Sequence, residues 1–293
     1  MTTRGIGAAR ARRIQSPLDA LYRDYDYDRR VASDAIQYPR RYADPLDREV
    51  AALLTASLAY GRVRLFGLWV ERLLAWLGPS PRAFALAFDP GRDAPRFAAF
   101  HYRFTRGVDV AAALLAIHRL LQRFGSLRGA FVAGYTEADP DIRPALDRFA
   151  ALILEQDFRP VGMRRPTRGF RHLFPRPRDG GACKRWNLFL RWMVRREYPD
   201  FGDWPEVSPA KLVIPLDTHV ANMASAIRLT RLRSRTWRMA EDVTQTLRRL
   251  DPDDPVKYDF ALCHTRMRGD CLDRRDARVC PGCGLRVVCR HWQ

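Results

Sequence analysis

Apolar residues recur at steps of three and four along most of the chain, which is the spacing that gathers side chains on one face of an α-helix. Between Arg48 and Arg62 this face holds Val50, Leu53 and Leu58. Strict alternation of apolar and polar residues, the pattern of half-buried strands, is scarce. The sequence therefore predicts an all-α protein. Further helices are expected at Leu65–Leu77, Val110–Phe124, Leu127–Tyr135, Ile142–Gln156 and Thr236–Leu250.

Proline, glycine and arginine divide this helical pattern. The stretch Arg159–Gly181 is crowded with all three and predicts a long basic loop. Met1–Ile14 is rich in arginine and has no acidic residue, so we expect a disordered basic arm, with a transit peptide as the alternative. Three parts are expected: 1–42, the arm with short helices that pack against the C-terminal part; 43–203, a helical lobe; and 204–293, a second helical lobe.

The charge of the chain points to a polyanionic partner. It carries 51 Lys and Arg against 33 Asp and Glu, a formal net charge of +18 at pH 7. Nucleic acid is the commonest such partner, and a genome biased toward arginine codons is the alternative explanation. The lysines are three, Lys184, Lys211 and Lys257. Because lysine can lose its proton in a protein and arginine cannot, a lysine in such a chain is a candidate nucleophile.

The expected compartment follows from two absences in the sequence. No apolar run reaches the length of a transmembrane helix, and no secretory signal opens the chain. We therefore expect a cytoplasmic protein without a membrane partner. In that compartment the six cysteines are not expected to form a disulfide framework.

Lys184 follows Gly180 and Gly181 and begins a predicted amphipathic helix. The glycines allow a ligand to approach the backbone closely, and the N–H groups at a helix start favour an anion such as a phosphate. In its neutral form the amine could attack a sugar carbon. A solvated lysine in the first turn is the plainer interpretation.

Asp217 begins a second predicted helix, in the segment PLDTHV at 215–220. Aspartate is a preferred N-cap, so a structural cap is the plainer interpretation here. A carboxylate near Lys184 would instead stabilise positive charge that develops on a sugar. Local sequence leaves both interpretations open.

The segments GGACKRWNLFL at 180–190 and PLDTHV resemble the helix-hairpin-helix DNA glycosylases of the endonuclease III type. A bacterial branch of that superfamily is still more similar, because LDREVAALLTASLAYGR at 46–62 and DPVKYDFAL at 254–262 also match. The resemblance implies a two-lobed all-α fold. It implies that Lys184 is the Schiff-base nucleophile and Asp217 the catalytic carboxylate. DNA contacts are implied for Gly180, Gly181, Arg185 and Asn187, with Tyr60 or Arg62 inserted into the DNA stack.

Two features depart from the endonuclease III pattern. The family hairpin has two glycines flanking an apolar residue, whereas Ala182 takes the second place here, so we expect a distorted hairpin. The interval from Lys184 to Asp217 is longer than in endonuclease III. Archaeal 8-oxoguanine glycosylases have a comparably long interval, which favours an oxidised purine as the substrate base.

Four cysteines near the C-terminus have the spacing of a metal or cluster site. Cys271, Cys280, Cys283 and Cys289 form a C-x8-C-x2-C-x5-C pattern. The endonuclease III type ends in a C-x6-C-x2-C-x5-C motif that holds a [4Fe–4S] cluster, and the last two intervals match. The resemblance therefore favours a cluster loop of this kind. Zinc bound by four cysteines is the alternative.

These observations together predict a monomeric DNA glycosylase and AP lyase of base excision repair, associated with a bacterial nucleoid. Its substrate would be duplex DNA with a damaged base, flipped out because the glycosidic carbon cannot be reached inside the stack. A non-catalytic nucleic-acid-binding protein that retains the glycosylase fold is the alternative.

Overall fold

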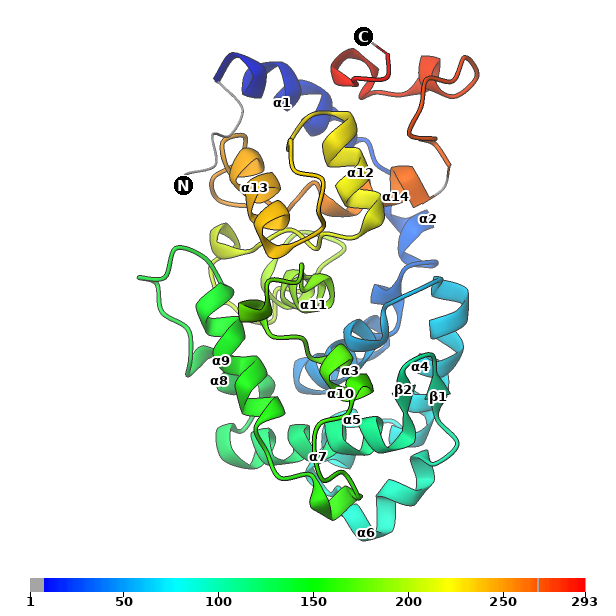
Figure 1. The fold of residues 1–293 in the computed structure, drawn as a ribbon, viewed down its shortest axis with the longest axis vertical. Helices are drawn as coiled ribbons and strands as arrows, with labels where there is room; N and C mark the ends of the chain where they lie inside the picture. Colours follow the sequence, from blue (N-terminus) through cyan, green and yellow to red (C-terminus); the bar gives the residue numbers. More distant parts are fainter. Residues whose placement is uncertain (1–7, 268, 293) are drawn as a thin grey trace. The chain divides into compact units, whose positions relative to one another are not determined.

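The computed structural model describes residues 8–267 and 269–292, which are mostly helical (Figure 1). Within them the strands are confined to one antiparallel hairpin, β1 (His101–Tyr102) with β2 (Thr105–Arg106). The prediction of a helical protein is confirmed, and this hairpin is the exception to it. Internal packing groups the chain into two units, each described by itself: unit 1 consists of 1–30, 180–201 and 208–293, and unit 2 of 31–179 and 202–207.

Unit 2 is built on two buried helices, α3 (Pro45–Leu58) and α7 (Gly107–Phe124). Helix α3 begins where the Asp44 carboxylate accepts a hydrogen bond from the Leu46 backbone N–H at 2.9 Å. Helix α7 ends at Gly125, whose φ of +77° is the left-handed conformation that glycine adopts without strain. The remaining α-helices are α4 (Val63–Leu77), α5 (Pro81–Leu86), α6 (Pro90–Asp93), α8 (Leu127–Val132), α9 (Arg143–Leu154) and α10 (Arg168–Leu173).

Helix α7 is the centre of this packing, because α5, α8, α9 and α10 all contact it (Figure 1). Its residues from Val110 to Ile117 are buried, so both its faces are covered. Short 3₁₀ helices complete the unit: η1 (Ala35–Gln37), η2 (Pro39–Arg41), η3 (Ala94–Phe97), η4 (Arg159–Val161) and η5 (Pro177–Asp179).

Unit 1 is built on α11 (Lys184–Val194), which is buried from Arg185 onward. Helices α12 (Thr218–Ala226) and α14 (Asp259–Met267) pack against each other. The other elements are α1 (Ala8–Arg23), α2 (Tyr27–Val31) where unit 2 begins, η6 (Pro209–Lys211), α13 (Trp237–Arg248), η7 (Cys280–Gly282) and η8 (Arg286–Val288). No helix of the described ranges is long and apolar enough to cross a membrane.

Two predictions about irregular segments are corrected. The predicted loop Arg159–Gly181 contains α10, because Thr167 caps the helix by accepting a hydrogen bond from Phe170 N at 2.9 Å and Phe170 is fully buried. The predicted disordered arm is helical from Ala8, since Ile14 on α1 has no exposed surface. The first seven residues of that predicted arm lie outside the described residues.

Candidate active site

Lys184 is the first residue of α11, and its side chain is half-buried. The residue before it, Cys183, is buried and has a φ of +47°, so the chain turns sharply into the helix. Within the described part of the chain, the Lys184 amine forms no hydrogen bond and no ion pair. The amine is therefore free to meet a ligand at the start of the helix.

The two glycines before Lys184 are held by main-chain contacts with the start of α13. The backbone N–H of Trp237 donates to the Gly180 carbonyl at 3.0 Å, and Gly181 forms an isolated antiparallel bridge with Thr236. A Cβ atom at either glycine would meet no atom within 4 Å. The backbone there faces open space, which is the geometry that a close phosphate contact requires.

Asn187 and Arg185, which were expected to contact DNA, are buried on α11. Asn187 is 1% exposed, and its Nδ2 donates to the Ala182 carbonyl at 3.2 Å. Arg185 is 9% exposed. Asn187 therefore fixes the turn that presents Lys184, and the accessible groups of this segment are the lysine and the two glycines.

Asp217 is the N-cap of α12, as the plainer interpretation predicted. Its Oδ1 accepts a hydrogen bond from the Val220 backbone N–H at 2.9 Å. The thiol of Cys263, on α14, donates to its Oδ2 at 3.7 Å. The side chain is half-buried, so the carboxylate is fixed in direction while part of it stays accessible. A capping role and a catalytic role are compatible at this position.

Asp259, the first residue of α14, is a buried carboxyl group that sequence reasoning missed. It is 2% exposed and forms an ion pair with Arg191 Nη1, while its Oδ1 has no hydrogen-bond partner in the described structure. Burial raises the pKa of Asp259 to about 6, with a further upward contribution from the charge of Asp217 and opposing ones from Arg191 and Lys184. The amine of Lys184 and the carboxylate of Asp217 thus both lie within electrostatic range of one buried acid.

A buried chain of ion pairs holds α11 and the start of α14 in place. Arg191 Nε contacts Asp200 Oδ1 at 3.1 Å, and Arg195 Nη1 contacts Asp200 Oδ2 at 2.5 Å. Arg195 also reaches Asp254 Oδ2 at 2.8 Å. Removing one partner from such a buried network leaves an uncompensated charge and is strongly destabilising. The network therefore makes the position of Asp259 relative to α11 rigid.

Tyr60 and Arg62 lie in unit 2, after the end of α3. The Tyr60 hydroxyl donates to the Tyr102 carbonyl at 3.0 Å and lies 2.9 Å from Thr105 Oγ1. Arg62 is exposed and precedes α4. The hydroxyl of Tyr60 is thus engaged within the unit, whereas the side chain of Arg62 extends into solvent.

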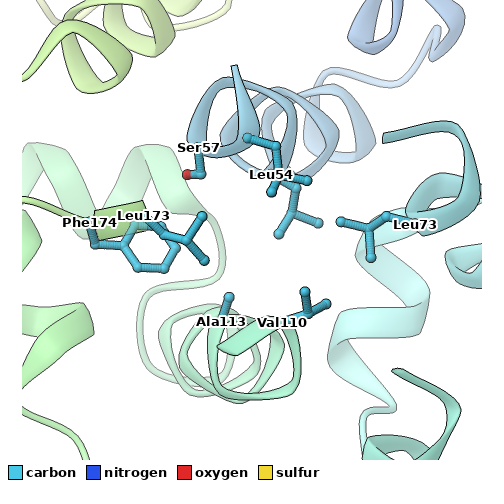
Figure 2. Close-up of a pocket in the computed structure, with 8 residues that line it drawn as sticks. Leu54, Ser57, Leu73, Val110, Ala113, Leu173 and Phe174 are labelled. Carbon is cyan, nitrogen blue, oxygen red and sulfur yellow. The ribbon is translucent and has the colours of Figure 1, made fainter. Parts of the chain in front are cut away.

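A small cavity lies in the core of unit 2, where α3, α4, α7 and α10 meet (Figure 2). Its volume is about 10 Å³, and Ser57 is the one polar residue among those that line it. Binding sites combine apolar walls with several convergent polar groups, which this cavity does not offer. It is a packing gap and no candidate for catalysis. Its apolar walls include Leu54, Leu73, Val110, Ala113 and Leu173.

The four cysteines of the tail lie close enough for their charges to interact. Burial raises the pKa of the Cys283 thiol, and the charges of Cys271, Cys289 and Cys280 raise it further. The Asp276 backbone N–H donates to Cys280 Sγ at 3.4 Å. No three His, Cys, Asp or Glu residues of the described ranges are arranged around a single ion position. Four cysteine thiols are a donor set that suits either a [4Fe–4S] cluster or a zinc ion.

Comparison with known proteins adds one match. The model of the family described as "Protein of unknown function (DUF2400)" matches residues 34–268. This range contains Lys184, Asp217 and Asp259 and ends before the four cysteines. No curated protein and no solved structure matches the chain.

Proposed function

The chain belongs to the DUF2400 family, and we propose that it is a DNA glycosylase with associated lyase activity. The observation that carries this proposal is that the charges of Lys184 and Asp217 both act on one buried carboxyl group of unit 1, Asp259. Lys184 has an unpaired amine at the start of α11, and Asp217 has a fixed carboxylate at the start of α12. Both lie within electrostatic range of Asp259. The resemblance of Lys184 and Asp217 to the endonuclease III motif and the net charge of +18 support DNA as the substrate.

In the proposed reaction, the Nζ of Lys184 attacks C1′ of a flipped-out nucleotide. A bond forms between Nζ and C1′ as the glycosidic C–N bond breaks, and the electron pair leaves with the base, which then takes up a proton. Asp217, held by its cap hydrogen bond, stabilises the positive charge that develops on the sugar. After the sugar ring opens, the resulting imine acidifies the C2′ proton, and its loss expels the 3′-phosphate.

The attacking amine must first lose a proton, and two carboxyl groups could accept it. Asp217 is the more accessible of the two. Asp259 is fully buried, and with a pKa of about 6 it changes charge near neutral pH. We propose that Asp217 acts on the substrate directly. Asp259 is 2% exposed and cannot touch DNA, so we assign it the role of positioning the residues around it.

Borohydride trapping tests the nucleophile directly. Incubation of the wild-type protein with damaged duplex and borohydride should give a covalent protein–DNA adduct. Lys184→Gln should abolish the adduct, while Lys211→Gln, the same change on η6, should leave it intact. An adduct that persists in Lys184→Gln would show that another amine reacts. Asp217→Asn should lower base release and leave DNA binding nearly unchanged.

The second candidate function is nucleic-acid binding without catalysis. It is favoured by the contacts of Asp217, whose two carboxylate oxygens are engaged by Val220 N and by the Cys263 thiol. A panel of duplexes that each contain one damaged base separates the two functions. Cleavage of any member supports the glycosylase, whereas tight binding with no cleavage across the panel supports the binding protein.

For the tail, we propose that Cys271, Cys280, Cys283 and Cys289 bind a [4Fe–4S] cluster, with zinc as the alternative. The group would supply rigidity to a segment whose 3₁₀ helices η7 and η8 are only three residues each. A cluster protein is brown and contains iron, whereas a zinc protein is colourless. Cys283→Ser should reduce the bound metal in either case, as measured by elemental analysis.

A further inference from the structure

The hairpin of unit 2 carries an exposed aromatic ring at its tip. Arg103 and Phe104 are the two turn residues between β1 and β2. Arg103 has a φ of +51°, in a position of two-residue hairpins that glycine normally takes. Phe104 is 47% exposed, among the most exposed large apolar side chains of the described residues. The turn thus accepts an unfavourable backbone conformation and directs a phenyl ring into solvent.

Two further rings lie beside Phe104. The ring centroids of Tyr60 and Phe104 are 6.5 Å apart, and the ring planes are inclined by only 17°. His172, from α10, meets both rings edge-on, at 5.2 Å from Phe104 and 4.7 Å from Tyr60. We call Tyr60, Phe104 and His172 the aromatic platform. Its members come from three separate segments of unit 2.

The platform is fixed by buried contacts. Asp109, which is 1% exposed, accepts hydrogen bonds from the Arg106 backbone N–H at 2.8 Å and from the Thr167 hydroxyl. It thereby ties the hairpin to the start of α10. At Gly169 a Cβ atom would lie 2.3 Å from the Phe104 carbonyl oxygen, so only glycine permits this approach of α10. A rigid support of this kind lowers the entropy cost of binding a ligand.

Two arginines that form no ion pair in the described structure, Arg168 and Arg103, lie close to the platform. The Arg168 guanidinium lies 5.2 Å from the centroid of Phe104, and the Arg103 Nη1 would lie 3.2 Å from a Cβ atom at Gly61. In the described structure no ion pair involves Arg62, Arg64, Arg103, Arg106 or Arg168, and all five are exposed. The segments 59–70, 101–108 and 160–175 contain no Asp or Glu.

This absence of acidic partners contrasts with other arginines of unit 2. Arg92 is paired with Asp93 at 2.7 Å, and Arg159 with Asp157 at 2.8 Å. The arginines near the platform therefore carry uncompensated positive charge beside exposed rings. That combination matches a strand of nucleic acid, whose bases stack on aromatic rings while its phosphates pair with arginine. An apolar protein segment would use the rings and gain nothing from the charges.

We propose that the aromatic platform stacks an unpaired base of single-stranded DNA, with Arg103 and Arg168 binding the adjacent phosphates. The choice of DNA over other polyanions rests on the proposed function. The platform lies wholly in unit 2, so the inference needs none of the chemistry assigned to Lys184 or Asp217. The exposed ring of Phe104 is the stacking surface. The ring of Tyr60, whose hydroxyl is hydrogen-bonded to the Tyr102 carbonyl, packs next to it.

The experiment measures binding of a fluorescein-labelled 15-nucleotide single strand, and of the same strand with one 2-aminopurine. Phe104→Ala should weaken binding about 5- to 100-fold, the range found for loss of one base–aromatic stack. Phe104→Tyr should bind within about twofold of wild type, because it restores the ring. The wild type should quench 2-aminopurine and Phe104→Ala should not. Leu68→Ala is the matched control, since Leu68 is 62% exposed on α4 of the same unit.

Salt titration separates the rings from the charges. Arg103→Gln and Arg168→Gln should each reduce the dependence of affinity on salt, whereas Phe104→Ala should leave that dependence unchanged. Equal affinity of Phe104→Ala and wild type, or an equal loss in Leu68→Ala, would overturn the proposal. So would a wild-type protein that does not bind the strand or that prefers an apolar peptide. A protein that quenches 2-aminopurine yet forms no borohydride adduct and cleaves no member of the damaged-duplex panel would refute the proposed glycosylase and lyase activity alone.

Discussion

Glu49 offers the sharpest test of how unit 2 is held together. It is 1% exposed on α3 and accepts three hydrogen bonds. The donors are Leu127 N at 2.6 Å, Arg128 N at 3.0 Å and Trp204 Nε1 at 3.1 Å. One carboxyl group thus joins α3, the start of α8 and the segment Gly202–Val207, which returns to unit 2 from far along the chain.

Glu49→Ala would remove the acceptor of two buried N–H groups and of the half-buried Arg128 N–H. Each such group costs about 1–3 kcal/mol, so the variant should lose at least about 3 kcal/mol of unfolding free energy. Glu49→Gln keeps the shape and one acceptor oxygen, and should lose less than Glu49→Ala. Glu71→Gln is the control, because Glu71 pairs with Arg41 on the surface, where an ion pair is worth at most about 1 kcal/mol.

The same group gives unit 2 a defined pH dependence. Burial raises the pKa of Glu49 from 4.5 to about 7, against the three N–H donors that lower it. The folded state therefore favours the protonated form. Its stabilising contribution is complete below about pH 4.5 and is lost as the pH rises through about 7. The free energy of unfolding should therefore fall by about 3 kcal/mol between these two pH values, and Glu49→Gln should abolish this fall.

The measurement is urea unfolding followed by tryptophan fluorescence at several pH values between 4.5 and 8. Hydrogen exchange of the Leu127 and Arg128 amides gives a local readout at the hydrogen bonds themselves. The reasoning is refuted if Glu49→Ala is as stable as wild type. It is also refuted if Glu49→Gln retains the wild-type loss of stability between pH 4.5 and 7.

Two other predictions concern single buried contacts. Asp259→Ala should cost about 1.5–3 kcal/mol in unfolding free energy, because Arg191 would lose one of its two buried carboxylate partners and keep Asp200, and thermal unfolding measures the loss. A melting temperature equal to that of wild type would show that Asp200 alone is enough to compensate Arg191. Gly169→Ala should destabilise the protein by about 1–3 kcal/mol through the clash of its Cβ with the Phe104 carbonyl. Gly282→Ala, where a Cβ meets nothing within 4 Å, should change little, and a similar loss in both would contradict the steric explanation.

The helices were predictable because burial of a helix face leaves a periodic trace in the sequence. The expected helix Val110–Phe124 is α7, extended by one turn to Gly107. The α10 helix was missed because it is six residues long, too short for periodicity, and lies among prolines and arginines. The hairpin was missed for the same reason, since each strand has two residues.

The half-buried residues of the candidate site, Lys184 and Asp217, were predictable from the sequence, and the buried ones were not. Lys184 and Asp217 stand at helix starts that local sequence marks. Asp259 and Glu49 are carboxylates whose partners are distant in sequence, Arg191 by 68 residues and Trp204 by 155. Only the fold brings such pairs together, so no spacing within one segment reveals them. The DPVKYDFAL segment contained Asp259 without indicating its role.

The bridge between Gly181 and Thr236 has a consequence for how this protein can change over evolution. Together with the hydrogen bond from Trp237 N to the Gly180 carbonyl, it locates the turn before Lys184 through peptide groups alone. Every residue type except proline supplies the same N–H and C=O groups. Side chains can therefore be exchanged where φ is negative, as at Ala182, while Lys184 stays in place, whereas Gly180, with a φ of +80°, favours glycine. Divergence at such positions carries little information about whether Lys184 is still in place.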